Sequence, residues 1–236
     1  MELKKYVSLA LAGLMTVSML AGCKNNTTGG DGQNGEVEVT PSSSYTQNIM
    51  DRTSDVTKAL FNGETSTKLD DVVEHIANNI FISGIIHKNP YGDYYEVVGT
   101  DKLGHDGLTL IDEVAPPVEE AKTLMGDATY MMNCATSDDT NELIPTKAGK
   151  KTVYTLLRAS RYLTDERINN ELAAYMDEIA AAVNSQLEAK GMQDECTYTV
   201  SMSKADCIVF NKANRVWDSV LVGIVWQIEY TPETFA

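Results

Sequence analysis

The chain of 236 residues has few of the side chains on which most enzyme chemistry depends. It contains only 3 histidines and 4 cysteines, and no C-x-x-C pair, so a thiolate zinc site is not indicated. The motifs G-x-S-x-G and H-E-x-x-H and a phosphate-binding glycine loop are absent, and no S-x-x-K is followed by its partner motifs. These absences disfavour the common hydrolases, and we expect no cofactor and no metal.

Basic residues are also scarce. Lys and Arg number 19 against 34 Asp and Glu, which gives a formal net charge of -15 at pH 7. An acidic surface is repelled by nucleic-acid phosphates and by anionic lipid headgroups. Nucleic acid is therefore not an expected partner, and surface charge does not supply adhesion to a membrane.

The apolar run near the N-terminus is too short to span a membrane. Residues 6–21 number about 16, whereas a spanning helix needs roughly 20 apolar residues. Lys4 and Lys5 precede the run, and small residues end it. A basic start, a short apolar middle and a small-residue end are the layout of a secretory signal.

The end of this run reads Leu20-Ala21-Gly22-Cys23 and resembles the lipobox of bacterial lipoproteins at all four positions. The resemblance covers these 23 residues only. It implies that residues 1–22 are removed and that Cys23 becomes the lipidated first residue. Acyl chains contribute about 0.8 kcal/mol per buried CH₂, so two or three of them hold a protein firmly on a membrane. The expected location is the extracytoplasmic face of the cell membrane, with the membrane as a partner through this lipid.

The rest of the chain divides into a tether and one domain. Residues 23–44 are rich in Gly, Asn, Thr and Ser and cannot bury enough apolar surface to offset their ordering entropy. They predict a flexible tether, with residues 36–39 as an alternative short edge strand. Residues 45–236 suit a single domain with its own core.

Apolar residues at helical spacing predict several helices. The clearest follows Thr164 as N-cap and ends at Gly191. A second covers residues 67–80, with Thr67 and Asp70 as a capping pair. Further helices are expected over residues 46–61 and 147–163 and after the prolines at 116–117, and residues 80–89 fit either helix or strand.

After Gly191 the apolar period changes to two, which predicts strands. Strands are expected over residues 94–98, 108–114, 196–202, 207–210 and 219–230, with a turn at 203–206. The last strand is apolar on both faces, which is typical of a central strand covered by a helix. The sequence therefore predicts an α+β fold: a C-terminal antiparallel strand meander packed against the long helix and several shorter helices.

The mature cysteines other than Cys23 are Cys134, Cys196 and Cys207. A disulfide is permitted outside the membrane, and Cys196 with Cys207 is one candidate pair, although buried free thiols are the simpler expectation. With an odd number, at least one of the three has no partner within the chain.

Two of the three histidines are candidates for chemistry. His105 lies in a glycine-flanked loop beside Asp106, where the two side chains can converge as an acid–base pair. His87 is the other candidate histidine. A simple turn and a core histidine are the alternatives. His75 is expected to form a solvated pair with Asp71, one helical turn away. The loop that contains His105 and Asp106 does not fit a calcium-binding EF-hand, because two ligand positions lack a carboxylate.

One stretch favours binding. Tyr91, Asp93, Tyr94 and Tyr95 border a Pro/Gly turn, and exposed tyrosines on loops offer flat apolar faces with polar tips that suit sugars or peptides. The alternative is that Tyr94 and Tyr95 pack inward as strand residues.

Three functions remain open. The anchor, the tether and the missing catalytic motifs favour a lipid-anchored binding or accessory module at the cell envelope, whose partner is an envelope protein, a wall polymer or a small ligand. The chain is short for the two-lobed solute receptors that feed transporters. A hydrolase acting on envelope material through His105, Asp106 and His87 is the second hypothesis, and a structural or assembly role is the third.

Overall fold

A computed structural model describes residues 43–80, 82–83, 85–88, 94–97, 107–111, 113–131, 139–160, 163–210 and 216–232. The leader, Cys23 and the tether with its alternative strand at residues 36–39 lie outside the described residues, as does Cys134. The element bounds below concern the described residues.

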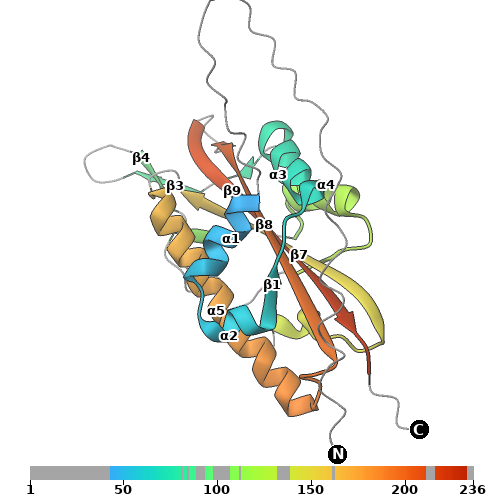
Figure 1. The fold of residues 1–236 in the computed structure, drawn as a ribbon. Helices are drawn as coiled ribbons and strands as arrows, with labels where there is room; N and C mark the ends of the chain where they lie inside the picture. The colour runs from blue at the N-terminus through green and yellow to red at the C-terminus, as the bar shows by residue number, and fades with distance from the viewer. Residues whose placement is uncertain are drawn as a thin grey trace, which may run out of the picture. The chain divides into compact units, whose positions relative to one another are not determined.

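Three long strands form the centre of a seven-stranded sheet (Figure 1). They are β7 (Gly149–Ser160), β8 (Cys196–Phe210) and β9 (Val216–Tyr230). β9 lies between the other two and is antiparallel to both. β7 and β8 are therefore parallel to each other and one strand apart, and the helix that follows β7 makes the crossover between them.

Four short strands complete the two edges of this sheet. They are β1 (Phe61–Gly63), β2 (Ile82–Ser83), β5 (Leu108–Leu110) and β6 (Thr129–Tyr130). β1 and β2 both pair with β8, and both run parallel to it. β5 and β6 pair with β7 on the opposite edge. A separate two-stranded sheet joins β3 (Ile85–Lys88) to β4 (Tyr94–Val97).

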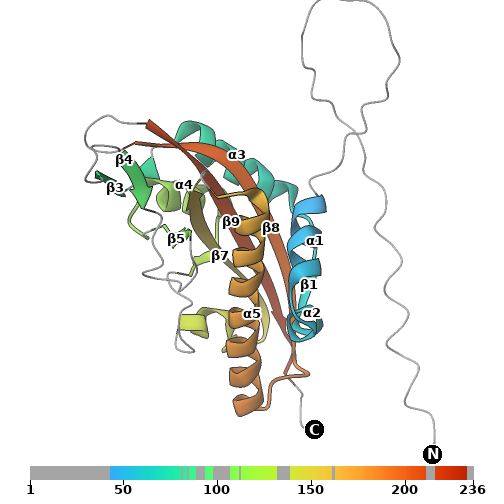
Figure 2. The same cartoon turned by 90° about the vertical axis from the view of Figure 1, so that its left-hand side faces the viewer.

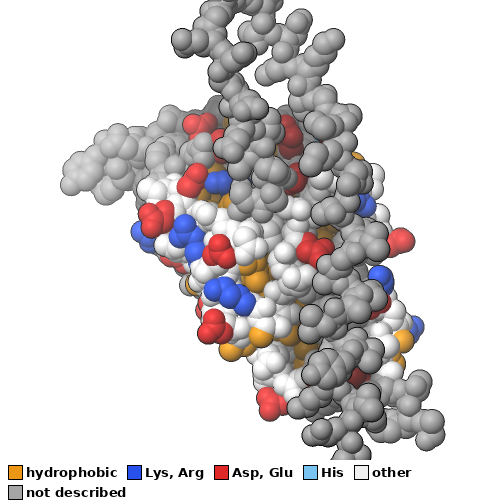
Figure 3. Space-filling view, in the orientation of Figure 1, with side chains coloured by type: hydrophobic (Ala, Val, Ile, Leu, Met, Phe, Trp, Pro, Cys, Tyr) orange, Lys and Arg blue, Asp and Glu red, His pale blue; other side chains and the backbone are white. Residues whose placement is uncertain are grey.

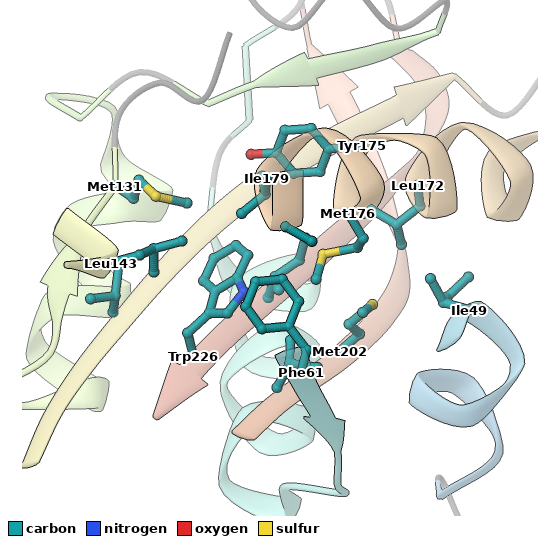
Figure 4. Packing of buried hydrophobic residues seen from close by; sticks show 14 of the residues in the cluster. Ile49, Phe61, Met131, Leu143, Leu172, Tyr175, Met176, Ile179, Met202 and Trp226 are labelled. Carbon is teal, nitrogen blue, oxygen red and sulfur yellow. The ribbon is translucent and has the colours of Figure 1, made fainter. Parts of the chain in front are cut away.

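The long helix α5 (Asp165–Lys190) covers one face of the sheet. The Thr164 hydroxyl accepts a hydrogen bond from the Arg167 amide, and Gly191 ends the helix in the left-handed conformation, so both predicted ends are confirmed. Its apolar stripe packs on the side chains of β9 that point to this face, among them Val222, Ile224 and Trp226 (Figure 4). This packing forms the larger of two cores.

Two helices precede β1 on the same face as α5 (Figures 1 and 2). They are α1 (Ser43–Arg52) and α2 (Asp55–Leu60), separated by a break at Thr53 and Ser54. The prediction of a single helix over residues 46–61 is therefore wrong in two respects, since the chain breaks once and then continues as a strand. Ser54 causes the break, because its hydroxyl accepts from the Thr57 amide and starts a new helix.

The other face of the sheet carries α3 (Thr67–Asn79) and α4 (Pro116–Met125), with a second core beneath them. α4 begins with its two prolines, as predicted. α3 is capped by Ser66, whose hydroxyl accepts from the Leu69 amide, so the predicted Thr67/Asp70 pair is wrong by one residue. Residues 80–89, which fitted either element, contain strands β2 and β3.

The α+β class is confirmed, and so is the packing of the β8–β9 pair against the long helix. Two predictions inside it are wrong. Residues 147–163 contain strand β7 instead of a helix, because both of its faces are buried and the alternation that marks a strand is lost. Residues 203–206 continue β8 instead of forming a turn, and the strand predicted over 108–114 ends at Leu110.

Candidate functional site

Two features that bear on function lie at the end of the sheet where β7 finishes and α5 begins. Gly107 lies there, immediately before β5, with φ of 83°. A Cβ atom on Gly107 would lie 2.0 Å from Leu163 Cδ1, just ahead of α5, so only glycine fits. His105 and Asp106 precede this glycine and lie outside the described residues.

Arg158 in β7 is a buried charged residue close to the same end. It is 5% exposed, pairs in register with Thr109 of β5 and Leu221 of β9, and makes polar interactions. A guanidinium presents a planar fork of donors that suits carboxylates and phosphates, and it is rarely buried without such a partner. Sequence reasoning missed this residue, although an arginine inside the apolar run from Val153 to Ala159 was a usable signal.

Strands β3 and β4 place a candidate catalytic residue opposite a candidate binding residue. His87, a candidate for catalysis, pairs in register with Tyr95, a candidate for binding, and Lys88 pairs with Tyr94. His87 is a strand residue and not part of a continuing helix. Tyr91 and Asp93 belong to the connection between the two strands and lie outside the described residues. The register thus joins His87 to the tyrosine group and leaves its relation to His105 and Asp106 as a hypothesis.

The third histidine has a partner other than the expected one. His75 Nε2 lies 3.0 Å from Glu120 Oε1, so it bridges α3 to α4 instead of pairing with Asp71 on its own helix. Both side chains are partly exposed. The contact is a hydrogen bond between two helices at the surface and indicates no catalytic role.

Neither of the two described cysteines forms a disulfide. Cys196 and Cys207 lie on the same strand, eleven positions apart, and pair in register with Tyr230 and Ser219. At about 3.4 Å per residue they are far beyond bonding distance, so the candidate disulfide is wrong. Burial raises the pKa of the Cys196 thiol, which makes it a poor nucleophile.

Polar side chains line the contact of α1 and α2 with α5, and this contact is called here the seam. Lys204 Nζ on β8 lies 3.1 Å from Asp165 Oδ2 and 5.3 Å from the centre of the Tyr45 ring. Burial, followed by the nearby Asp165 carboxylate, raises the pKa of the Tyr45 hydroxyl far above its ordinary value. Tyr45 therefore stays neutral at physiological pH. On the visible part of the face in Figure 3, acidic side chains are mixed with Lys and Arg and form no single patch.

No metal centre is formed by the described residues, among which no group of three or more His, Cys, Asp or Glu side chains is placed to hold an ion. Within the same part of the chain, no helix combines the length and the apolar character that crossing a membrane requires. A comparison of the sequence and fold with protein-family models, curated proteins and solved structures finds no match.

Proposed function

We propose that this protein is a lipid-anchored, extracytoplasmic binding or accessory module of a bacterial cell envelope. The observation that carries the proposal is Leu20-Ala21-Gly22-Cys23 at the end of a short apolar run with a basic start. An anchor of this kind has its use where a folded domain must stay near a membrane without spanning it.

The organisation of the described residues supports this proposal. The core residues in the described part of the chain all follow Ser43, and residues 23–44 have the polar composition expected of a tether. About 20 residues of flexible coil have an end-to-end distance of roughly 25 Å. The domain can then reach partners close to the membrane surface.

The binding role is assigned to the β3–β4 region. Its strand pairing gathers Tyr94, Tyr95 and His87 within a few positions of one another, next to Tyr91 and Asp93 in the sequence. Aromatic side chains combined with one or two polar groups are typical of sites for sugars and peptides. Wall polymer is the ligand class we favour, because it is the most abundant sugar–peptide material outside such a membrane.

Mass spectrometry of the protein from a bacterial host tests the anchor. The expected result is an N-terminus at Cys23 that carries acyl chains, with the protein in the membrane fraction. Cys23→Ser is expected to retain the leader and lose the lipid. An unmodified Cys23, or a wild-type protein that keeps its leader, would overturn the proposal.

Co-sedimentation with purified cell-wall material tests the ligand class separately. The double variant Tyr94→Ala/Tyr95→Ala is expected to lose most of the sedimenting protein, whereas Tyr230→Ala, a partly buried tyrosine on β9, serves as the matched control. Equal sedimentation of all three proteins, or none by the wild type, would reject wall polymer and leave the anchor result unaffected.

A further inference from the structure

One hydroxyl group takes the place of a neighbouring strand on the edge of β8. β1 pairs with β8 as far as Val200, and β2 pairs with β8 from Val209 onward. Between these points, Thr46 Oγ1 on α1 donates to the Met202 carbonyl at 3.1 Å and accepts from the Met202 amide at 2.9 Å. A hydroxyl can do both at once, and it thereby satisfies the two groups that an adjacent strand would otherwise bind.

Helix α1 lies beside β8 and also makes polar contacts with α5 (Figures 1 and 2). Asn48 Oδ1 accepts from Arg52 Nε at 3.1 Å and from Asn169 Nδ2 at 3.2 Å. Arg52 Nη1 donates to Asn170 Oδ1 at 2.6 Å. Bonds of this kind exchange readily for bonds to water, so they hold the helix less firmly than apolar burial does.

The seam between α1 and α5 also contains two buried polar atoms without a hydrogen-bond partner in the described part of the chain. They are Tyr45 Oη and Asn169 Oδ1. The Arg52 bond fixes the Asn48 amide, and Asn48 in turn fixes the Asn169 amide, so that the Asn169 oxygen is left without a donor. Each unsatisfied atom disfavours the state in which α1 is docked, because water would satisfy both once the helix moves away.

The break between α1 and α2 provides a hinge. Asp177 Oδ1 on α5 accepts from the Ser54 amide at 2.8 Å and from the Thr57 hydroxyl at 2.5 Å. These bonds hold α2 on α5 and involve no residue of α1.

Two bonds tie α1 to the segment that follows it: Thr53 Oγ1 donates to the Met50 carbonyl at 2.8 Å, and Lys58 Nζ on α2 donates to the Asp51 carbonyl at 3.1 Å. Helix α1 can leave while α2 and β1 stay in place if the Lys58 bond breaks and residues 53–54 absorb the change in backbone angles.

We propose that α1 is a releasable cover of the β8 edge. In the minor, open state it turns about residues 53–54 and exposes the amide and carbonyl of Met202 to water. The closed state prevails because Ile49 and Met50 are buried in the core, where Ile49 points toward Leu172 and Met202 (Figure 4). The device does not depend on lipidation of Cys23.

Amide hydrogen exchange followed by NMR on the purified protein tests this cover. We expect the amides of Ile49, Met50 and Met202 to exchange at least 100-fold faster than those of Ile224 and Trp226 in β9. Ser203 is the internal control, because its amide turns to β9 and stays protected when α1 opens. Exchange of the α1 and Met202 amides at the β9 rate would mean that they open only by global unfolding, and it would overturn the proposal.

Two variants sharpen the test. Thr46→Val keeps the shape and removes both bonds to Met202, and it is expected to speed exchange of the Met202 amide about tenfold, whereas Thr46→Ser restores protection. Gly63→Ala places a methyl group 3.0 Å from Met50 Cγ and 3.5 Å from Thr46 Cγ2, and is expected to favour opening without touching a hydrogen bond. If neither change alters exchange at Met202 relative to Ser203, α1 is not a releasable cover.

Discussion

Helices α1 and α3 both contact strand β8, but they are attached to the sheet by different chemistry. α3 buries four apolar side chains against the sheet: Leu69, Val72, Val73 and Ile76. Val73 and Leu69 approach Gly223 of β9 so closely that a Cβ there would lie 2.5 Å from Val73 Cγ2. α1 buries two apolar side chains, Ile49 and Met50, packs the partly buried Tyr45 ring beside them, and makes further contacts through hydroxyl, amide and guanidinium groups.

This difference separates a permanent layer from a movable one. Apolar packing in a dense core has no substitute in water, so α3 is expected to leave the sheet only when the whole domain unfolds. Polar contacts are replaced by water at small cost, so α1 is expected to open locally. The four tests below probe this contrast, in order of decreasing expected effect.

The largest effect is expected from the glycine beneath α3. Gly223→Ala forces Val73 and the helix away from the sheet and should lower the free energy of unfolding by about 1–3 kcal/mol, the usual cost of overpacking. Chemical denaturation measures it. The matched change beneath α1, Gly63→Ala, is close to the Met50 side chain and at ordinary contact distance from Thr46, and it should leave global stability within about 1 kcal/mol of the wild type. Equal losses for both would remove the distinction between the two layers.

Two buried tyrosines should respond in opposite directions. Tyr198 donates to the Leu143 carbonyl at 2.9 Å, so Tyr198→Phe leaves a buried acceptor unsatisfied and should cost about 1–2 kcal/mol. The Tyr45 hydroxyl is buried without a partner, so Tyr45→Phe should be neutral or stabilise by up to about 1 kcal/mol. Thermal denaturation of the two variants decides, and a clear loss of stability in Tyr45→Phe would contradict the description of the seam.

Alkaline pH should weaken both faces of the sheet. Burial, with smaller effects of Glu119 and Glu113, raises the pKa of Tyr154 beneath α4 to about 12, and burial also raises the pKa values of Tyr45 and Tyr198. An unfolded tyrosine titrates near pH 10, so the stability due to neutral tyrosine is present below about pH 10 and is lost as pH rises toward 12. Denaturation midpoints measured from pH 8 to 12 should stay level and then fall, and Tyr45→Phe should fall less steeply. A level profile to pH 12 would argue against this burial.

The smallest effects concern one polar side-chain contact on each face of the sheet. Asp165→Asn removes the partner of Lys204 and a favourable charge at the start of α5, and should cost about 0.5–1 kcal/mol. Glu120→Gln removes the partner of His75 and should cost less than about 0.5 kcal/mol. The difference for Asp165→Asn should shrink at high salt, and denaturation at two ionic strengths checks this. A larger loss from Glu120→Gln would show that polar contacts matter more to the α3 side than its packing suggests.

Elements marked by several local signals that agree could be predicted from the sequence. α5 carries a continuous apolar stripe, a capping threonine and a terminal glycine, and each signal agrees with the others. β9 could also be predicted, because a run such as Val220–Trp226 is too apolar for an edge strand. Local signals sufficed wherever several of them pointed to the same element.

The failures at β7 and at residues 203–206 share a physical cause, which is that tertiary contacts overrode local patterns. β7 contains Leu156, Leu157 and Arg158 within a run that fits helical spacing, yet β9 pairs along its whole length. Lys204 and Asp206 look like turn residues, but they lie in mid-strand on one face of β8. Such residues are placed by strand pairing with segments distant in sequence, which no local pattern contains.

The candidate site was predictable only in outline. The sequence singled out His87 and Tyr95, and strand pairing then placed these two positions opposite each other. It gave no reason to choose Thr46, because a threonine in the first turns of a helix is common and its role depends on Met202, 156 positions away. His105 and Asp106 stay a hypothesis that a functional assay must decide.

The position of β9 has a consequence for the order of assembly. This strand is made after β7, α5 and β8, yet it lies between β7 and β8 and contributes to both cores. A growing chain that ends before residue 216 has two long strands with nothing to join them, so neither core can close during most of synthesis. We therefore expect the domain to gain stable structure only when nearly all of the chain has been made, and until then an unfolded chain can still be threaded through a narrow pore.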